Sequence, residues 1–534
     1  MMIAAPRGTG VVFTSHDHLR TTMKSDAKNP GKELYQQLRR RSCAQLWLEE
    51  VPRFDRAAPR ERFERVALVR AVGVVFSEGG TAAEKDAARV WLRGLLHDPE
   101  EKIRRYAMAA LPKIGAGAGE ETELLALLQT TASEREKKFL GQALGKIGGA
   151  ATLDAAVALP AQTAQKVAAH VARSASPSAV RLDRALADFA ALRIHLRGRA
   201  GLEKIVRAEV EERGQKFRVA EVRRGLVALT PVAPFALGDI FALRCFGTVG
   251  FVLGTAPVSD GPDAIEELAA AITSPLARHL FATFTDGAPR YRLDFIAKGH
   301  QRGAVRLLAN RAYALCPDLL NDPRNAPWAI DIHPAGRGCT AELRPRLSPD
   351  PRLWFRQQDV PAASHPPLAA CMARLAGRVE NDILWDPFCG SGLELIERVF
   401  LGGVRSVFGT DLSADAIAIS RANFAAAQLG SVPAQFTCAD FRDFATVPGL
   451  GPESATLIIT NPPMGMRVPI PNLRGLIEDL FATAAAVLRP SGRLVFANPL
   501  RLENRQPSLR MQSRETVDFG GFDCRLEMYR KATR

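Results

Sequence analysis

The sequence lacks any long hydrophobic run. Over its 534 residues no apolar stretch approaches the roughly 18–20 residues that span a bilayer, which argues against a membrane protein. Residues 1–30 mix Arg, Lys, Asp, Ser and Thr without the apolar core of a secretory signal, so we expect a flexible leader there. Together these absences favour a cytoplasmic protein that does not associate with membranes.

Closely spaced cysteine pairs are also missing. The chain has eight cysteines, and no two of them form a Cys-x-x-Cys pair. Zinc sites and the disulfide frameworks of small secreted domains both depend on such spacings. We therefore expect free thiols in a reducing compartment. The cysteines are Cys43, Cys245, Cys316, Cys339, Cys371, Cys389, Cys438 and Cys524.

Acidic residues are too few to balance the basic ones. Lys and Arg number 71 against 57 Asp and Glu, which gives a formal net charge of +14. Such an excess is typical of proteins with a polyanionic partner, most simply nucleic acid. The chain is also too long for one hydrophobic core, and its length predicts roughly three domains of about 100–200 residues each.

Residues 31–185 show helical periodicity almost throughout. Two segments, 99–115 and 134–148, resemble each other, and their Lys-Ile-Gly endings begin at Lys113 and Lys146, 33 residues apart. A period of that size is typical of stacked helix pairs. We expect an all-α domain of HEAT-like helical repeats, although two copies leave a plain helical bundle as an alternative.

Residues 190–350 mix short strands with helices. Because the strands are too short and too polar for a doubly wound sheet, we predict an α+β region of small mixed sheets with helices on one face. Strands are expected at 192–196, twice within 217–230, and at 291–297, 328–333 and 339–344, and helices at 202–212, 263–273 and 304–316.

From 355 to 534 apolar strand candidates alternate with helices. Helical stretches separate the first five candidates, and the last two can form a hairpin. This order predicts an α/β Rossmann-like sheet of five parallel strands with one antiparallel addition. The candidate strands are 383–385, 406–410, 434–438, 455–460, 493–497, 515–519 and 524–529.

A glycine turn follows the first of these strands, and a helix starts directly after it. Glycines let the backbone approach a nucleoside ligand, and free N–H groups at a helix start favour an anionic group. We predict that this turn binds a cofactor. The residues concerned are Asp386, Pro387, Phe388, Cys389, Gly390 and Gly392.

Carboxylates end the next two strands. Asp411, followed by Leu412, is placed to accept hydrogen bonds from ribose hydroxyls. Asp440, followed by Phe441, could meet an adenine amine. With the glycine turn, the two carboxylates predict a site for adenosine without a pyrophosphate, as in S-adenosylmethionine, and Leu412 and Phe441 are expected to bind the cofactor beside them. The turn alone would also suit NAD, or no ligand at all.

The fourth strand runs into Asn461, Pro462, Pro463 and Met464, which we predict to be catalytic. Prolines stop a strand ladder, but this does not explain the amide that precedes them. If the Asn461 side-chain oxygen and the Pro462 carbonyl accept the N–H groups of a nucleobase amine, the nitrogen lone pair is directed at an activated methyl group. Alignment and electrostatics then suffice, and no metal is implied.

Together these motifs resemble the THUMP-containing class I RNA methyltransferases, which modify the exocyclic amine of guanine. The resemblance covers roughly the last two-thirds of the chain. It implies S-adenosylmethionine as cofactor, structured RNA (tRNA or rRNA) as partner, and a ferredoxin-like linker with a THUMP region over 190–350. The residues that carry it are Asp386 to Gly392, Asn461 to Met464 with Gly465 and Arg467, the lead-in from Phe355 to Ala369, and the opening at Arg193, Gly198 and Gly201 to Glu203.

Two residues depart from the family pattern. Met464 stands where the family usually has Tyr or Phe, and Leu393 where it usually has Thr. These departures leave open an RNA-binding protein with a degenerate methyltransferase domain, whose helical repeats recruit a protein partner. An amino-methyltransferase acting on DNA adenine or protein glutamine is a further alternative, because the Asn-Pro-Pro loop suits those groups as well.

Arginine clusters support the RNA interpretation. Several of them are expected to flank the cleft, where they could contact phosphates. The last cluster is expected on a connection at the carboxyl edge of the sheet, beside Asn461. The clusters are Arg39 to Arg41, Arg193 with Arg197 and Arg199, Arg218 with Arg223 and Arg224, and Arg501 with Arg505, Arg510 and Arg514.

Overall fold

The computed structural model forms two compact units, Met1–Ser176 and Pro177–Arg534. The leader expected over 1–30 lies outside the described residues except for Pro30. No helix in the described part of the chain is long and apolar enough to cross a membrane. The described residues are 30–155, 161, 164–165, 167–168, 171, 177–257, 262–296, 301–336, 338–360, 363–465, 470–500 and 502–533.

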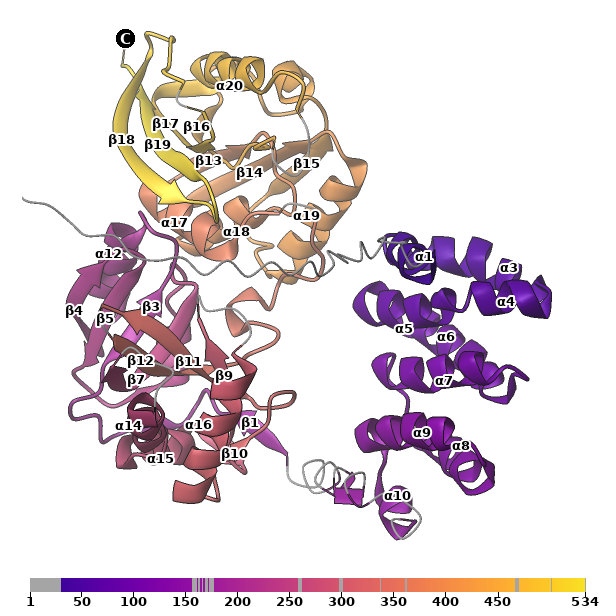
Figure 1. The fold of residues 1–534 in the computed structure, drawn as a ribbon. Helices are drawn as coiled ribbons and strands as arrows, with labels where there is room; N and C mark the ends of the chain where they lie inside the picture. The colour runs from indigo at the N-terminus through magenta and orange to yellow at the C-terminus, as the bar shows by residue number, and fades with distance from the viewer. Residues whose placement is uncertain are drawn as a thin grey trace, which may run out of the picture. The chain divides into compact units, whose positions relative to one another are not determined.

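The first unit is helical, as predicted (Figure 1). The two similar sequence segments form α7 and α9, which pack against each other, and α5 packs on the other side of α7. Residues 177–185, which we expected at the end of this domain, instead belong to the second unit, where 178–180 and 185–186 are strands. The helices are α1 (Pro30–Leu38), α2 (Cys43–Gln45), η1 (Leu46–Glu50), α3 (Val51–Arg56), α4 (Pro59–Glu64), α5 (Ala67–Gly79), α6 (Ala82–Gly94), η2 (Leu95–His97), α7 (Glu101–Ala110), η3 (Leu111–Lys113), α8 (Ala118–Thr130), α9 (Glu134–Ile147) and α10 (Ala150–Asp154).

The second unit begins with one eight-stranded mixed sheet in place of the small sheets we expected. Its strand order is β10-β9-β11-β12-β7-β3-β5-β4. Helix α12 packs on β4 and β5, while α14 packs on β7 and α16. The elements are β3 (Ile194–Arg197), α12 (Glu203–Arg213), β4 (Phe217–Arg223), β5 (Leu226–Pro231), α13 (Leu237–Phe241), β7 (Thr248–Pro257), α14 (Pro262–Ile272), α15 (Pro275–Phe284), β9 (Arg290–Phe295), α16 (Arg302–Leu315), β10 (Leu320–Asn321), β11 (Trp328–Ala335) and β12 (Gly338–Pro345).

Strand β7 joins the two halves of this sheet, and the sequence pattern did not reveal it. Its two glycines weaken the strand signal. A Cβ at Gly250 would lie 2.5 Å from the Glu342 carboxylate, and one at Gly254 would lie 2.8 Å from the Ala271 side chain. The glycines therefore make room for neighbours that are distant in sequence. Two short pairs complete this part: β1 (Ser178–Val180) with β8 (Thr285–Gly287), and β2 (Ala185–Leu186) with β6 (Phe235–Ala236).

The chain then forms a seven-stranded sheet with order β15-β14-β13-β16-β17-β19-β18, in which the first five strands are parallel. The terminal hairpin adds two antiparallel strands, so the predicted Rossmann-like topology is confirmed. The elements are η5 (Pro351–Leu353), α17 (Pro366–Ala376), β13 (Asp382–Asp386), α18 (Leu393–Phe400), β14 (Val404–Asp411), α19 (Ala414–Ala426), β15 (Ala434–Cys438), η6 (Phe441–Thr446), β16 (Ala455–Thr460), α20 (Leu473–Val487), β17 (Leu488–Asn498), β18 (Leu509–Asp518) and β19 (Asp523–Lys531).

Both faces of this sheet are covered by helices, which explains its continuous apolar strands. Leu384 belongs to the core under α17, α18 and α19, while its neighbour Trp385 belongs to the core under α20. Figure 1 shows these helices on opposite sides of the sheet. Because β13, β14, β15 and β16 are parallel, their carboxyl ends meet at one edge of the sheet.

Buried contacts join the two sheets of the second unit. Arg244, from the central region, makes a bidentate ion pair with Glu397 of α18, with N···O distances of 2.6 and 2.7 Å. Glu209 of α12 accepts from Arg374 of α17 at 3.2 Å. Gly201 (φ +100°) lies against β18 so closely that a Cβ would stand 1.9 Å from the Thr516 carbonyl oxygen. The central region therefore packs tightly on the seven-stranded sheet.

Candidate active site

The glycine turn lies at the carboxyl edge of the seven-stranded sheet. Gly390 (φ 51°) and Gly392 (φ 78°) adopt left-handed conformations, which favour glycine. The Gly392 N–H closes the turn on the Cys389 carbonyl at 2.7 Å, and the Cys389 N–H donates to Thr410 of β14 at 2.9 Å. Burial raises the pKa of the Cys389 thiol, so this thiol stays protonated. The turn is thus built from its own backbone and held by the next strand.

Asp386 is fully buried at the end of β13. One carboxylate oxygen accepts from the Phe388 N–H at 3.0 Å and from the Thr460 hydroxyl at 2.6 Å. Its Oδ2 is buried with no hydrogen-bond partner among the described residues. Burial, together with the nearby negative charge of Glu394, raises the pKa of Asp386 well above its ordinary value. A cationic ligand beside this carboxylate would restore its charge.

Asp411 and Leu412 stand together at the end of β14. The Asp411 carboxylate accepts from the Gly390 N–H at 3.0 Å and from the Ser413 N–H at 2.9 Å, one bond to each oxygen. Each oxygen keeps a second lone pair that a ribose hydroxyl could use. The Leu412 side chain is 73% exposed, which is unusual for a large apolar group and fits the face of an adenine ring.

Asp440 pairs with Arg442, a partner that the sequence did not predict. Its carboxylate accepts from the Arg442 backbone N–H at 2.9 Å and from the Arg442 guanidinium at 2.8 Å. Phe441 is buried and packs against Phe388, with ring centroids 4.8 Å apart. Phe441 therefore supports the turn through Phe388, and an adenine amine at Asp440 would have to share the carboxylate with Arg442.

The Asn461 loop follows β16 at the same edge. Pro462 is buried, while Asn461, Pro463 and Met464 are half-buried. The Asn461 Nδ2 group donates to the Ser364 hydroxyl at 2.7 Å, and Oδ1 is buried without a partner among the described residues. An acceptor of this kind fits the N–H group of a substrate amine. Arg467, which belongs to the same motif, lies outside the described residues.

Three further residues belong to this edge, and the sequence patterns did not single them out. Ser364 also contacts the carboxylate of Glu394, in the first turn of α18. Asn423 of α19 donates to the carbonyl groups of Gln358 and Ser391, both at 3.0 Å, and so ties the lead-in segment to the glycine turn. The local signals were the place of Ser364 within the lead-in segment and the buried charged residue Glu394 at the start of α18.

These observations fit S-adenosylmethionine, which carries an ammonium and a sulfonium group. The edge offers a buried carboxylate with a free oxygen at Asp386, a polar end to β14 at Asp411 and an exposed apolar side chain at Leu412. Among the described residues no group of His, Cys, Asp and Glu side chains is arranged to hold a metal ion. All eight cysteines are free thiols.

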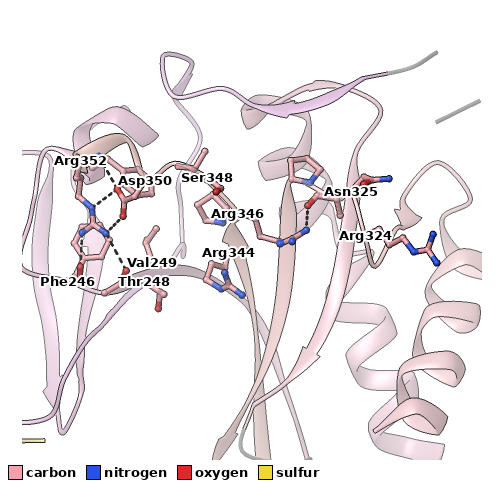
Figure 2. Close-up of a pocket in the computed structure, with 16 residues that line it drawn as sticks. Phe246, Thr248, Val249, Arg324, Asn325, Arg344, Arg346, Ser348, Asp350 and Arg352 are labelled. Carbon is pink, nitrogen blue, oxygen red and sulfur yellow. Dashed lines mark hydrogen bonds and ion pairs between the residues drawn. The ribbon is translucent and has the colours of Figure 1, made fainter. Parts of the chain in front are cut away.

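A separate pocket in the second unit is lined by arginines. It has a volume of about 580 Å³ and lies between the start of β7, the loop before β11 and the segment after β12 (Figure 2). Arg344 is paired with Asp331, and Arg352 with Asp350. Arg346 donates to the Ala326 carbonyl and makes no ion pair within the described residues. Burial and two neighbouring arginines, Arg292 and Arg344, lower its pKa.

In most of the predicted arginine clusters, arginines form ion pairs with carboxylates of the protein itself. Arg197 pairs with Glu342, and Arg514 pairs with Glu503 and Glu527. Arg510 lies in β18, opposite Arg530, near the amino end of the sheet, so its expected place beside Asn461 was wrong. Arg501 lies outside the described residues. The sequence showed where arginines gather but not which of them are paired.

Comparison with known proteins finds similar sequences and structures. A family model for the RMKL-like methyltransferase domain matches residues 353–528, which include the glycine turn and the Asn461 loop. A crystal structure of TrmN from Thermus thermophilus shares 20% sequence identity with a TM-score of 0.49, over 64% of this chain and 99% of that one.

Two sequence relatives are more informative. One, named "Probable tRNA (guanine(10)-N2)-dimethyltransferase", comes from Methanothermococcus thermolithotrophicus and is 30% identical over 139 residues, 25% of this chain and 81% of the relative. The other, a tRNA (guanine(10)-N2)-dimethyltransferase of Methanocaldococcus jannaschii, is 30% identical over 159 residues. That match covers 28% of this chain and 42% of the relative.

Proposed function

Since this chain belongs to the family of RMKL-like methyltransferases, we propose that it methylates the exocyclic N2 amine of guanine in RNA, with S-adenosylmethionine as the methyl donor. The observation that carries the proposal is the Asn461 amide at the edge where the glycine turn lies, whose oxygen is buried and has no partner among the residues that the structure describes. Both sequence relatives are named for this reaction on tRNA, so tRNA is the preferred substrate class.

The residues at the sheet edge divide into two tasks. Asp386 would hold the cationic amino-acid end of the donor, Asp411 would accept from its ribose, and Leu412 would cover its adenine. S-adenosylmethionine, when bound, supplies a methyl group that its sulfonium charge already activates. The chain must therefore align the acceptor, exclude water and stabilise positive charge that develops on the amine.

Asn461 and Pro462 perform the second task. A guanine N2 amine is a weak nucleophile because its lone pair is delocalised into the ring. If the Asn461 oxygen and the Pro462 carbonyl accept its two N–H groups, the nitrogen moves toward tetrahedral geometry and its lone pair becomes available. Met464 would lie against the base through its polarisable sulfur. A guanine within a duplex must be flipped out to reach this loop.

The arginine pocket supports RNA as the substrate. Arg346, which has no carboxylate partner in the described part of the chain, brings its guanidinium into a cavity that Arg344 and Arg352 also line. A phosphate would satisfy it with charge-assisted hydrogen bonds. We assign the central region to THUMP-type RNA binding on this basis, and the HEAT-like stack of the first unit to a protein partner. RNA modification of this kind would take place in the cytoplasm.

The test is methyl transfer from labelled S-adenosylmethionine to tRNA transcripts, with Asn461→Ala as the informative variant. We expect its rate to fall by about 10²–10³-fold, the usual effect of removing one aligned hydrogen-bonding group. Donor affinity, measured by calorimetry, should stay unchanged. Asn310→Ala, the same change on the exposed side of α16, serves as control. Full activity of Asn461→Ala would refute the catalytic assignment, and donor binding without transfer to any RNA would favour a degenerate enzyme.

A further inference from the structure

Three side chains from distant parts of the sequence form one hydrogen-bonded chain at the sheet edge. Ser364 precedes α17, Glu394 lies in the first turn of α18, and Asn461 follows β16. The Asn461 Nδ2 group donates to the Ser364 hydroxyl oxygen at 2.7 Å. The same hydroxyl donates to the Glu394 carboxylate. These hydrogen bonds thus connect the amine-binding loop to the helix that begins at the glycine turn.

The chemistry of the three side chains fixes which group donates and which accepts in each hydrogen bond. An ionised carboxylate only accepts hydrogen bonds, so the Ser364 hydroxyl must point its hydrogen at Glu394. The Ser364 oxygen can then only accept, and the Asn461 amide must turn its NH₂ group toward it. An amide by itself can sit in either of two flipped orientations. Glu394, acting through Ser364, selects the orientation that leaves the Asn461 oxygen free.

Burial makes the selection effective. Glu394 is 3% exposed, and Asn461 Oδ1 is buried. Water is therefore a poor substitute for either partner. In the flipped orientation the Asn461 NH₂ group would face the N–H groups of the substrate amine, and two donors would oppose each other. That arrangement removes the acceptor on which the proposed reaction depends.

We propose that Ser364 and Glu394 are positioning residues that hold the Asn461 amide with its oxygen toward the target amine. The proposal rests on the proposed function, because the task of Asn461 is taken from it. Neither positioning residue has to touch the RNA or the donor. Their effect should therefore appear in kcat and not in the affinity for either substrate.

The charged surroundings of Glu394 predict a pH signature. Burial raises its pKa, and the neighbouring Glu397 raises it further, while Ser364 and Arg356 lower it. Asp386, at the end of β13, also faces it. Once Glu394 takes up a proton, it no longer fixes the direction of the Ser364 hydroxyl. At saturating donor, kcat should therefore fall on acidification, at a pH above the ordinary range for glutamate.

The first experiment uses the full chain with tRNA and S-adenosylmethionine, both saturating. We expect Ser364→Ala to lower kcat by about 10²-fold, since small misplacements of an aligned group cost about that much. Donor affinity should stay at the wild-type value, while the thermal midpoint should fall modestly because the buried Glu394 carboxylate loses a hydrogen bond. Ser364→Thr keeps the hydroxyl and should restore most of the rate. Ser454→Ala, which removes a half-buried hydroxyl at the opposite edge of the sheet, is the matched control.

Glu394→Gln completes the set. Its amide can offer Ser364 either an acceptor or a donor, so kcat should fall by less than in Ser364→Ala, and the acidic limb of the pH profile should disappear. A wild-type rate in Ser364→Ala, or an unchanged acidic limb in Glu394→Gln, would overturn the proposal.

A second measurement separates this proposal from the proposed function. In protein with ¹⁵N-labelled asparagine, the side-chain NH₂ signal of Asn461 is assigned by its loss in Asn461→Ala. We expect that signal to shift in Ser364→Ala, to return toward its place in Ser364→Thr, and to move when Glu394 titrates. This readout needs no RNA. If the signal shifts but the protein methylates no RNA, the proposed function is wrong and the positioning role of Ser364 and Glu394 stands. If the signal does not move, the positioning role is wrong.

Discussion

The two ends of strand β13 carry the same side chain in opposite circumstances. Asp382 at the amino end and Asp386 at the carboxyl end are both fully buried. Each accepts a hydrogen bond from a threonine of β16, Thr456 at 2.8 Å and Thr460 at 2.6 Å. Beyond that the two ends differ, and the difference separates a group that stabilises the fold from one that is available to a ligand.

At the amino end the carboxylate charge is compensated. Arg398, fully buried, lies 2.5 Å from the Asp382 carboxylate, and Arg493 contacts both of its oxygens at 2.6 and 2.7 Å. At the carboxyl end no cation pairs with Asp386 among the described residues, and the nearby Glu394 is acidic. A buried charge without a partner is costly, and such groups cluster at functional sites.

The largest expected effect comes from breaking the compensated end. Asp382→Ala leaves Arg398 and Arg493 buried without their acid, which should lower the free energy of unfolding by about 3–5 kcal/mol. Urea unfolding followed by circular dichroism measures it. Asp386→Ala is the matched control at the other end of the strand and should cost clearly less; equal losses would contradict the distinction between the two ends.

The second-largest effect is expected on the affinity for the methyl donor, and it is tested at Asp386. Asp386→Asn keeps the shape but removes the charge, so a charge-assisted contact worth about 1.5–3 kcal/mol should be lost. The dissociation constant of S-adenosylmethionine should therefore rise by about 10–150-fold, measured by calorimetry. Unchanged affinity would show that Asp386 does not hold the cationic end of the donor.

Without donor, the same variant should reveal how much the ionisation of the buried Asp386 lowers the stability of the protein. Because its folded pKa is raised above the ordinary value of 3.8, its contribution to stability is complete below that pH and is lost as the pH rises through the folded pKa. Asp386→Asn lacks this loss. Its thermal midpoint relative to wild type should increase as the pH rises above about 4, through the raised folded pKa of Asp386. A difference that stays constant with pH would exclude a raised pKa.

The smallest effects concern the arginine pocket, where the same contrast recurs with opposite charge. Arg346→Ala should weaken tRNA binding and reduce the slope of log affinity against log salt by about 1, with little change in stability. Arg344 is paired with Asp331, so Arg344→Ala should mainly destabilise the protein. Filter binding over a salt series tests both. Equal salt slopes for wild type and Arg346→Ala would exclude a phosphate at Arg346.

The sequence predicted what local patterns encode. The parallel strands were found because each is a short apolar run, and the glycine turn, Asp411 and Asn461 were found because they follow such strands directly. Strand β7 escaped because its glycines serve distant neighbours. Ser364 and Glu394 escaped because their contact joins residues 30 positions apart, and Ser364 reaches Asn461 across 97. Pairing of arginines was likewise invisible, since charge counts do not reveal partners.

The ion pair between Arg244 and Glu397 bears on how this chain can be divided. The matched methyltransferase segment, 353–528, contains Glu397 and Arg374 but neither Arg244 nor Glu209. A fragment cut at that boundary would carry a carboxylate and a guanidinium whose counter-charges were left behind. The segment that the family model matches is therefore not a segment that keeps all of its ion pairs, and expression trials should begin upstream of β3.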